Sequence, residues 1–246
     1  MHNKEQYPKE LFHLIVEYAK KKSEILNIDL LESIKLYTPI YYLIGNHEWE
    51  FKEDSIYWKE FVQRYEKGED LVELINDMYI RNDKAENSHK WYGCFRYKYV
   101  EDENGIGTVK LHFLNNRSSK EGPLSSTQTE KRLEELKEMF EDIKKNHPNI
   151  KYVEGGSWLY NIEAYKRLFP KEYTNNMRSV PPKTNNLVIW GQFINSEWSI
   201  KKDYAQRFLN KIKKAKRKED LENSFEMFSL FPKAEIKYFY NFYSII

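Results

Sequence analysis

The chain has 246 residues, enough for one large domain or two smaller ones with a hydrophobic core. Its 40 Lys and Arg residues nearly balance 38 Asp and Glu residues, which argues against a dedicated nucleic-acid-binding protein. Hydrophobic residues make up 40% of the sequence, too many for a disordered chain. A single cysteine, Cys94, excludes an intramolecular disulfide framework. The first residues lack the apolar segment of a secretory signal, and no apolar run is long enough to span a bilayer, so we expect a cytoplasmic protein with no membrane partner.

Residues 1–88 are predicted to form a helical N-terminal region. Leu11, Leu14, Ile15 and Tyr18 recur at helical spacing. The same period continues at Ile56, Phe61, Tyr65, Leu71, Leu74, Ile75 and Met78. A polar stretch then predicts a domain boundary, and we expect the second domain to comprise residues 89–246.

In the second domain the hydrophobic period changes to two, so the runs around residues 91–99 and 109–113 predict strands. Asn104 and Gly105 lie between them and tolerate positive φ, which predicts a β-hairpin. A helix over 125–146 follows, with Ser125 and Gln128 as its capping box. Further strands are predicted at 150–159, 187–194 and 236–242, and further helices at 161–169, 200–215 and 220–228. This order predicts an α+β fold with a mixed, largely antiparallel sheet flanked by helices.

The loop before the long helix has the composition of an anion site. It contains Arg117, Ser118, Ser119, Lys120 and Gly122, and it leads to a helix N-terminus. Free backbone N–H groups and the positive end of the helix dipole favour an anion there, and Arg and Lys add charge-assisted contacts to phosphate. The alternative is an ordinary capped helix after a polar loop.

A second candidate site lies farther along the chain. Gly155 and Gly156 interrupt a predicted strand, which indicates a bulge or the close approach of a ligand. Asn161 begins the next predicted helix, where its side chain either caps the helix or faces a ligand.

The order of these elements and these residues resembles the GNAT family of N-acyltransferases over about residues 91–242, as in bacterial acyltransferase-like proteins with an N-terminal helical region. In that family the loop before the main helix binds the pyrophosphate of coenzyme A, and an Asn-x-x-Ala segment follows the next strand; Asn161 and Ala164 match that segment. The resemblance implies coenzyme A contacts from Arg117, Ser118, Ser119, Lys120, Gly122, Leu124, Ser125, Ser126 and Asn161.

The activity that the resemblance implies is transfer of an acyl group from a coenzyme A thioester to an amine on a small molecule or peptide. Glu154 or His112 is the candidate general base, and Tyr160 or Tyr165 is the candidate acid that protonates the departing thiolate. Packing is the alternative role for each of these side chains.

A non-catalytic binding or interaction protein with the same fold is the second hypothesis. Leu124 stands where the phosphate loop has a second small residue, and Leu168 stands where the family often has a tyrosine. A third hypothesis is a nucleic-acid-associated factor that uses the basic run 211–218, but flanking acidic residues make this partner unlikely. The stretch containing His47 and Glu50 lacks the spacing of a metal site, so no metal is expected.

Overall fold

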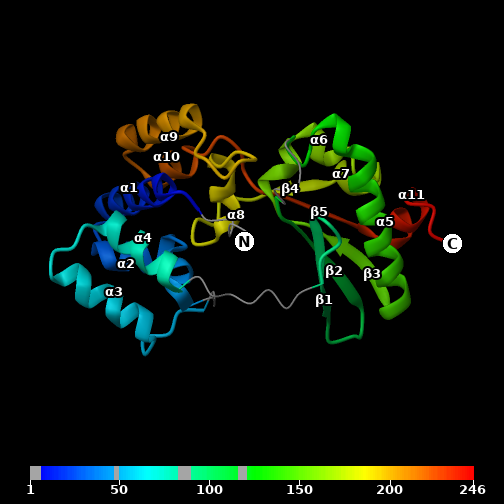
Figure 1. The fold of residues 1–246 in the computed structure, drawn as a ribbon, viewed down its shortest axis with the longest axis horizontal. Coiled ribbons are helices and arrows are strands. Elements are labelled where there is room, and N and C mark those ends of the chain that lie inside the picture. The colour runs from blue at the N-terminus through cyan, green and yellow to red at the C-terminus, as the bar shows by residue number, and fades with distance from the viewer. Residues whose placement is uncertain (1–6, 47–49, 83–89, 116–120) are drawn as a thin grey trace. The chain divides into compact units, whose positions relative to one another are not determined.

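The computed structural model describes residues 7–46, 50–82, 90–115 and 121–246. The chain divides into two compact units: unit 1 combines Met1–Asn87 with Pro182–Glu226, and unit 2 combines Ser88–Pro181 with Met227–Ile246 (Figure 1). Unit 2 thus begins where the sequence predicts the second domain. The segment Pro182–Glu226, expected in that second domain, is part of unit 1 in the structure.

Unit 1 is helical in the part that the structure describes. Its helix ends follow local chemistry: Asn27 adopts a left-handed conformation after the first helix, and Asp29 caps the second by accepting a hydrogen bond from the Leu31 backbone N–H at 2.7 Å. Its elements are α1 (Lys9–Leu26), α2 (Leu30–Tyr37), η1 (Tyr42–Asn46), α3 (Ile56–Glu66), α4 (Leu71–Asn82), α8 (Leu187–Trp190), η4 (Gly191–Phe193), α9 (Lys202–Lys214) and α10 (Lys218–Glu222).

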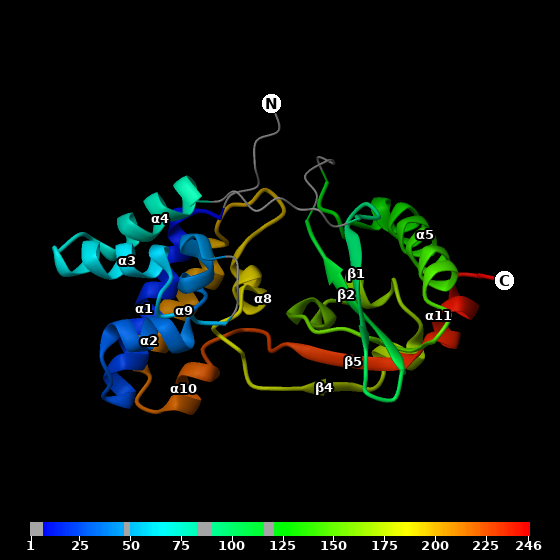
Figure 2. The ribbon, with the colours of Figure 1, turned by 90° about the horizontal axis from the view of Figure 1, so that it is seen from below.

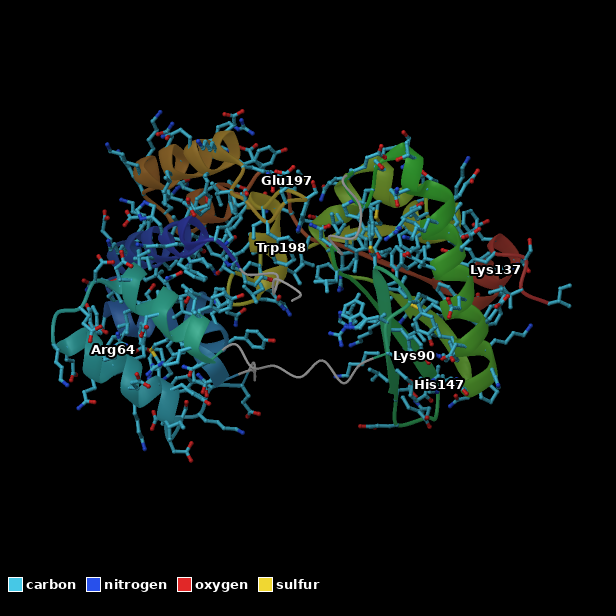
Figure 3. The ribbon with its side chains drawn as sticks, viewed as in Figure 1. Arg64, Lys90, Lys137, His147, Glu197 and Trp198 are labelled. Carbon is cyan, nitrogen blue, oxygen red and sulfur yellow. The ribbon has the colours of Figure 1, made fainter. Side chains whose placement is uncertain are left out.

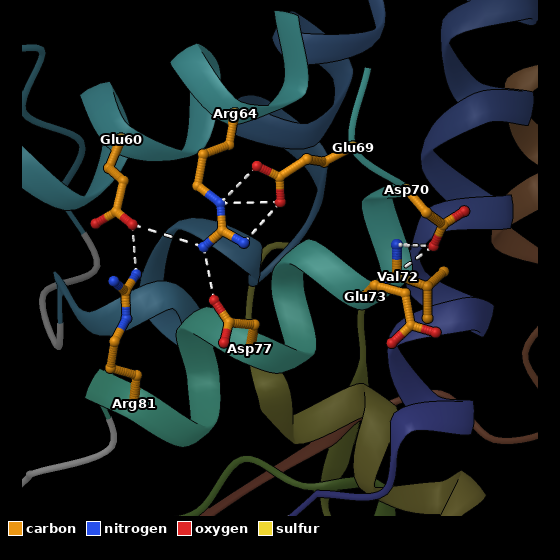
Figure 4. Close-up of polar contacts among 8 residues, drawn as sticks. All are labelled: Glu60, Arg64, Glu69, Asp70, Val72, Glu73, Asp77 and Arg81. Atoms are coloured by element: carbon orange, nitrogen blue, oxygen red, sulfur yellow. Dashed lines mark hydrogen bonds and ion pairs between the residues drawn. The ribbon is translucent and has the colours of Figure 1, made fainter. Parts of the chain in front are cut away.

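An ion-pair network joins α3 to α4 (Figure 4). The Arg64 guanidinium on α3 contacts Glu69 in the connecting segment and Asp77 on α4, each at 2.6 Å. Glu60 on α3 pairs with Arg81 on α4. These partners raise the pKa of Arg64, and their ion pairs with its guanidinium join α3 to α4.

An aromatic cluster explains why the segment Pro182–Glu226 belongs to unit 1. Tyr18 on α1 packs against Trp190 at 5.6 Å and Phe225 at 5.8 Å between ring centroids, and Trp190 packs against Phe208 at 5.8 Å. The predicted strand 187–194 is therefore wrong. This apolar run forms α8 and η4, whose start is capped by Asn186 and whose buried rings fill the space beside α1.

Unit 2 contains a five-stranded mixed sheet in the order β1-β2-β3-β5-β4. Figure 2 shows β4 beside β5. The pair β2 and β3 is parallel and the other pairs are antiparallel, so the predicted mixed, largely antiparallel sheet is confirmed. The strands are β1 (Phe95–Glu101), β2 (Gly107–Phe113), β3 (Ile150–Glu154), β4 (Met177–Ser179) and β5 (Leu230–Glu235). The helical elements are η2 (Ser126–Gln128), α5 (Thr129–Asn146), η3 (Trp158–Asn161), α6 (Glu163–Lys166), α7 (Lys171–Thr174) and α11 (Ile236–Phe242).

The predicted hairpin and long helix are both present, with one correction. The Asp102 carboxylate accepts hydrogen bonds from the backbone N–H groups of Asn104 and Ile106 at 2.9 Å, which closes the hairpin turn. The predicted capping box is wrong, because α5 begins at Thr129 and the Ser125 side chain caps no backbone N–H. Neither β4 nor β5 was predicted from the sequence.

The final segment differs from its prediction as well. Residues 236–242 form the helix α11 instead of a strand. Phe239 and Tyr243, four residues apart, stack on Phe140 of α5 at 4.9 and 5.3 Å. Helical spacing brings both rings to the same partner, whereas residues four positions apart in a strand are separated by about 13 Å. Tertiary packing thus decides the conformation of this aromatic run.

The core of unit 2 lies on one face of the sheet. Phe95, Val109, Val153 and Ala234 point to this face, where α5, α6, α7 and α11 supply their buried partners. Alternate residues of the same strands, which include Lys98, Lys110 and Lys233, point to the opposite face.

Polar contacts join β1 to α5 at the end of the sheet where Lys90 and His147 lie (Figure 3). The Asp142 carboxylate accepts hydrogen bonds from Lys90 Nζ at 2.7 Å and Tyr97 Oη at 3.0 Å. Burial raises the pKa of Asp142, but the hydrogen bonds from Lys90 and Tyr97 and the nearby Tyr92 hydroxyl outweigh it and lower that pKa to about 2.

A buried ion pair anchors the first turns of α5. The Arg132 guanidinium lies 3.0 Å from the Glu135 carboxylate and contacts the Cys94 thiol, and its side chain is only 4% exposed. Glu135 also accepts a hydrogen bond from the Cys94 backbone N–H at 3.1 Å. These contacts fix the residues before β1 to α5.

Candidate functional site

The predicted phosphate loop is only partly within the described residues. Arg117, Ser118, Ser119 and Lys120 lie outside them. The described remainder comprises Gly122, Leu124, Ser125 and Ser126, which lead into η2 and α5.

A carboxylate lies at this helix start. Glu121 accepts hydrogen bonds from the side-chain hydroxyls of Ser125, at 3.4 Å, and Thr127. The two hydroxyls lie 2.8 Å apart, and the Ser125 backbone N–H donates to the Gly122 carbonyl at 2.9 Å. The negative charge of Glu121 therefore lies beside the hydroxyl of Ser125, one of the residues predicted to contact coenzyme A.

Arg167 ties the same loop to α6. Its guanidinium donates to the carbonyl oxygens of Leu124 at 3.1 Å and Ser125 at 3.0 Å. Neither Glu121 nor Arg167 was predicted from the sequence. Arg167 is 42 residues from Ser125, and no motif links the two positions.

Glu154 and His112 point to the face of the sheet opposite the core. Glu154 is opposite Lys110 on β2 and Lys233 on β5, and its carboxylate pairs with Lys233 at 2.7 Å. His112 lies two residues beyond Lys110 on the same face, and its side chain is exposed. The structure therefore places both candidate bases on one face.

The strand break at Gly155 and Gly156 is filled by aromatic side chains. A Cβ at Gly155 would lie 2.2 Å from the Tyr160 hydroxyl and 2.4 Å from the Tyr173 hydroxyl. A Cβ at Gly156 would lie 2.8 Å from the ring of Phe231. Glycine is required here because other parts of the chain occupy the space that a side chain needs.

The candidate acids Tyr160 and Tyr165 belong to the core face. The Tyr160 hydroxyl lies 2.9 Å from that of Tyr173, and the rings of Tyr160 and Tyr165 pack at 5.0 Å. All three side chains are buried, and burial raises the pKa of each well above its usual value. These tyrosines thus lie on the opposite side of the sheet from Glu154 and His112.

Asn161 holds two chain segments together. Its side-chain amide donates to the carbonyl oxygens of Trp158 at 2.7 Å and Phe228 at 2.8 Å. Both amide hydrogens are donated to backbone carbonyls, so a structural role is sufficient to explain an asparagine at this position.

Other features of the described chain lie elsewhere. An open hollow of about 470 Å³ lies between the end of α5 and the C-terminal residues, lined by Glu141, Lys144, Lys145 and residues 244–246, away from the predicted site. Among residues 7–46, 50–82, 90–115 and 121–246, no three His, Cys, Asp or Glu side chains cluster as metal ligands do. None of the helices in these ranges has the length and apolar character of a membrane span.

Comparison of the chain with family models, with curated proteins and with solved structures finds no match.

Proposed function

We propose that the chain is a non-catalytic binding or interaction protein whose unit 2 has a GNAT-like fold. The filled strand break carries this proposal. Gly155 is in contact with the buried hydroxyls of Tyr160 and Tyr173, and Gly156 lies against Phe231. A ligand that approached this backbone would have to displace well-packed aromatic side chains.

The charge at the start of α5 supports the same conclusion. A pyrophosphate bound there would lie close to Glu121, which already engages the hydroxyls of Ser125 and Thr127. Two unit charges of the same sign at 4 Å repel by about 1 kcal/mol in water and by about 4 kcal/mol near a protein surface. The carboxylate therefore weakens the anion-binding capacity of this helix start.

The separation of the candidate catalytic groups is a third argument. General acid–base catalysis of acyl transfer requires the base and the acid to reach the same reacting centre. Glu154 and His112 lie on the face of the sheet opposite the core, whereas Tyr160 and Tyr165 are buried on the core face. These two pairs cannot share a substrate without repacking of the core.

Acyl transfer from coenzyme A to an amine is the second candidate function. The favouring observation is the element order, in which α5 connects the parallel strands β2 and β3 after an antiparallel hairpin. This is the order that the family resemblance implies. In this reading Arg117 and Lys120 supply the phosphate contacts, and Glu154 acts as the base.

A thermal-shift titration of the full chain with acetyl coenzyme A separates the two functions. Longer acyl thioesters extend the series, and a plain adenine nucleotide is the control. A ligand at about 100 times its Kd stabilises the folded state by about 2.7 kcal/mol. We expect no shift at millimolar thioester. A thioester-specific shift that disappears in the variant Arg117→Ala/Lys120→Ala would establish the acyltransferase site instead.

A further inference from the structure

The open face of the unit 2 sheet is basic. It is defined by the strand residues that alternate with the core residues, and its Lys and Arg members outnumber its two carboxylates, Glu154 and Glu235. The cations come from four of the five strands: Arg96, Lys98, Lys110, Lys233 and Arg178. The entire chain carries a formal charge of only +2, so this face concentrates positive charge locally.

The register places like charges opposite one another at one end of this face. Lys98 on β1 is directly opposite Lys110 on β2. Like charges in opposite positions of a strand pair destabilise the pair. Glu154, beside Lys110, pairs with Lys233 on its other side. The exposed Lys98–Lys110 pair is therefore stabilised by any anion that binds over it.

Aromatic rings accompany the cations. The Arg96 guanidinium carbon lies 5.2 Å from the ring centroid of Trp91, and Lys233 Nζ lies 4.5 Å from that of Tyr152. Trp91 and Tyr152 are both half-buried. Proteins that bind single-stranded nucleic acids combine cations for the phosphates with aromatic rings on which bases stack.

We propose that the open face of the unit 2 sheet binds single-stranded nucleic acid, with its phosphates over the Lys98–Lys110 pair and a base against Trp91. Charge complementarity selects an anion. The cations extend over several strands about 4.8 Å apart, which suits an extended polyanion better than a compact one. An acidic peptide would use the cations but would leave the rings without a planar partner. This inference goes beyond the proposed function and does not depend on whether unit 2 binds a thioester.

The basic run in unit 1 is the competing surface. Lys213 and Lys214 at the end of α9 are exposed, as Lys98 and Lys110 are. Cations at a helix C-terminus are already favoured by the helix dipole, which explains them without a ligand. The apolar side of α9 packs through Phe208 onto α1 and is therefore not available for insertion into a membrane.

Fluorescence anisotropy of the full chain with a labelled single-stranded oligonucleotide of about 20 residues tests the proposal. The face variant is Lys98→Gln/Lys110→Gln, and the matched control is Lys213→Gln/Lys214→Gln, which removes the same charge from exposed lysines elsewhere. We expect the face variant to bind at least about tenfold more weakly and the control to bind within about twofold of the wild type. The slope of log K against log salt should fall in magnitude by about 1.4 in the face variant, because each lost phosphate contact contributes about 0.7.

Two further arms identify the partner. Trp91→Ala should weaken binding about tenfold, since stacking of one base is lost, while the circular dichroism spectrum reports that the variant is folded. Poly-glutamate and a duplex of the same sequence should compete poorly with the single strand. The proposal is overturned by an absence of binding at about 50 mM salt. An equal loss in the Lys213→Gln/Lys214→Gln control, or equal competition by poly-glutamate or by the duplex, also overturns it.

Discussion

The substitution Gly155→Ala tests directly how the strand break is filled. The new Cβ would lie 2.2 Å from the Tyr160 hydroxyl and 2.4 Å from the Tyr173 hydroxyl, whereas ordinary contacts begin at 3.4 Å. At least one tyrosine must move by roughly 1 Å, which disrupts their 2.9 Å hydrogen bond inside the core. Overpacking costs about 1–3 kcal/mol, and an unsatisfied buried hydroxyl costs about 1–3 kcal/mol. We therefore expect unit 2 to lose about 3 kcal/mol of stability.

Hydrogen exchange followed by mass spectrometry is the assay, because it reports the opening free energy of each segment separately. Protection should fall in β3 and β5 and remain unchanged in α3 and α4. Gly68→Ala is the control, because Gly68 has a φ of +84° and no atom close to the position of a new Cβ. This substitution should therefore lower the stability of unit 1 by about 1 kcal/mol through backbone strain alone.

Repeating Gly155→Ala in a variant without the two tyrosine hydroxyls isolates their contribution. In the variant Tyr160→Phe/Tyr173→Phe both oxygen atoms are absent, and Gly155→Ala should cost less there by about 1 kcal/mol or more. A change of less than about 0.5 kcal/mol in the protection of β3 on Gly155→Ala would show that the strand break is not filled. The same cost of Gly155→Ala with and without the two hydroxyls would show that they do not occupy this space.

Three further predictions concern stability. Because the pKa of Asp142 falls from 3.8 to about 2 on folding, its carboxylate contributes about 2 kcal/mol to the free energy of unfolding above pH 4, and this contribution is lost as pH falls toward 2. In an acid titration, the unfolding free energy of Asp142→Asn should therefore vary less with pH over that window, and an unchanged profile would contradict this. Arg132→Met leaves the Glu135 charge buried without its partner and should lower the free energy of unfolding, measured in urea, by about 3 kcal/mol. Part of that stability should return in Arg132→Met/Glu135→Gln, and equal losses in the two variants would argue against the ion pair. Phe208→Ala should lower the free energy of unfolding by about 3–5 kcal/mol and reduce hydrogen-exchange protection in both α1 and α8. A loss of protection confined to α9 would show that the aromatic cluster does not hold the segments of unit 1 together.

Strong periodicity made several elements predictable. The buried positions Leu136, Phe140 and Ile143 of α5 have helical spacing, and Val109 and Leu111 of β2 alternate with polar residues. In each case local propensity and the buried face favour the same conformation. These elements are found close to the predicted bounds.

Short apolar runs were not predictable in the same way. Residues 187–194 and 236–242 are compatible with a buried strand or with a short helix, because both runs are short and consist mainly of apolar and aromatic residues. The packing of Trp190 beside Tyr18 and of Phe239 beside Phe140 selects the helix. These contacts join segments far apart in the chain, so no local pattern contains them.

The candidate site was predictable only as a set of residue types. The sequence shows that Glu154, Gly155 and Tyr160 are close together along the chain, but it does not show on which face of the sheet each side chain lies. Strand alternation and the tyrosine hydrogen bond separate Glu154 from Tyr160 in the structure. The contacts of Glu121 and Arg167 depend on loop geometry, for which the sequence has no motif.

The central claim is that unit 2 does not use the start of α5 to hold coenzyme A. The most direct measurement is hydrogen exchange of residues 121–128 and of β3, with and without millimolar acetyl coenzyme A. If unit 2 does not hold coenzyme A there, the hydrogen-exchange protection of both segments should be identical with and without the thioester. Increased protection at these two segments on addition of the thioester, with no change for a plain adenine nucleotide, would contradict the claim and assign the site to acyl transfer.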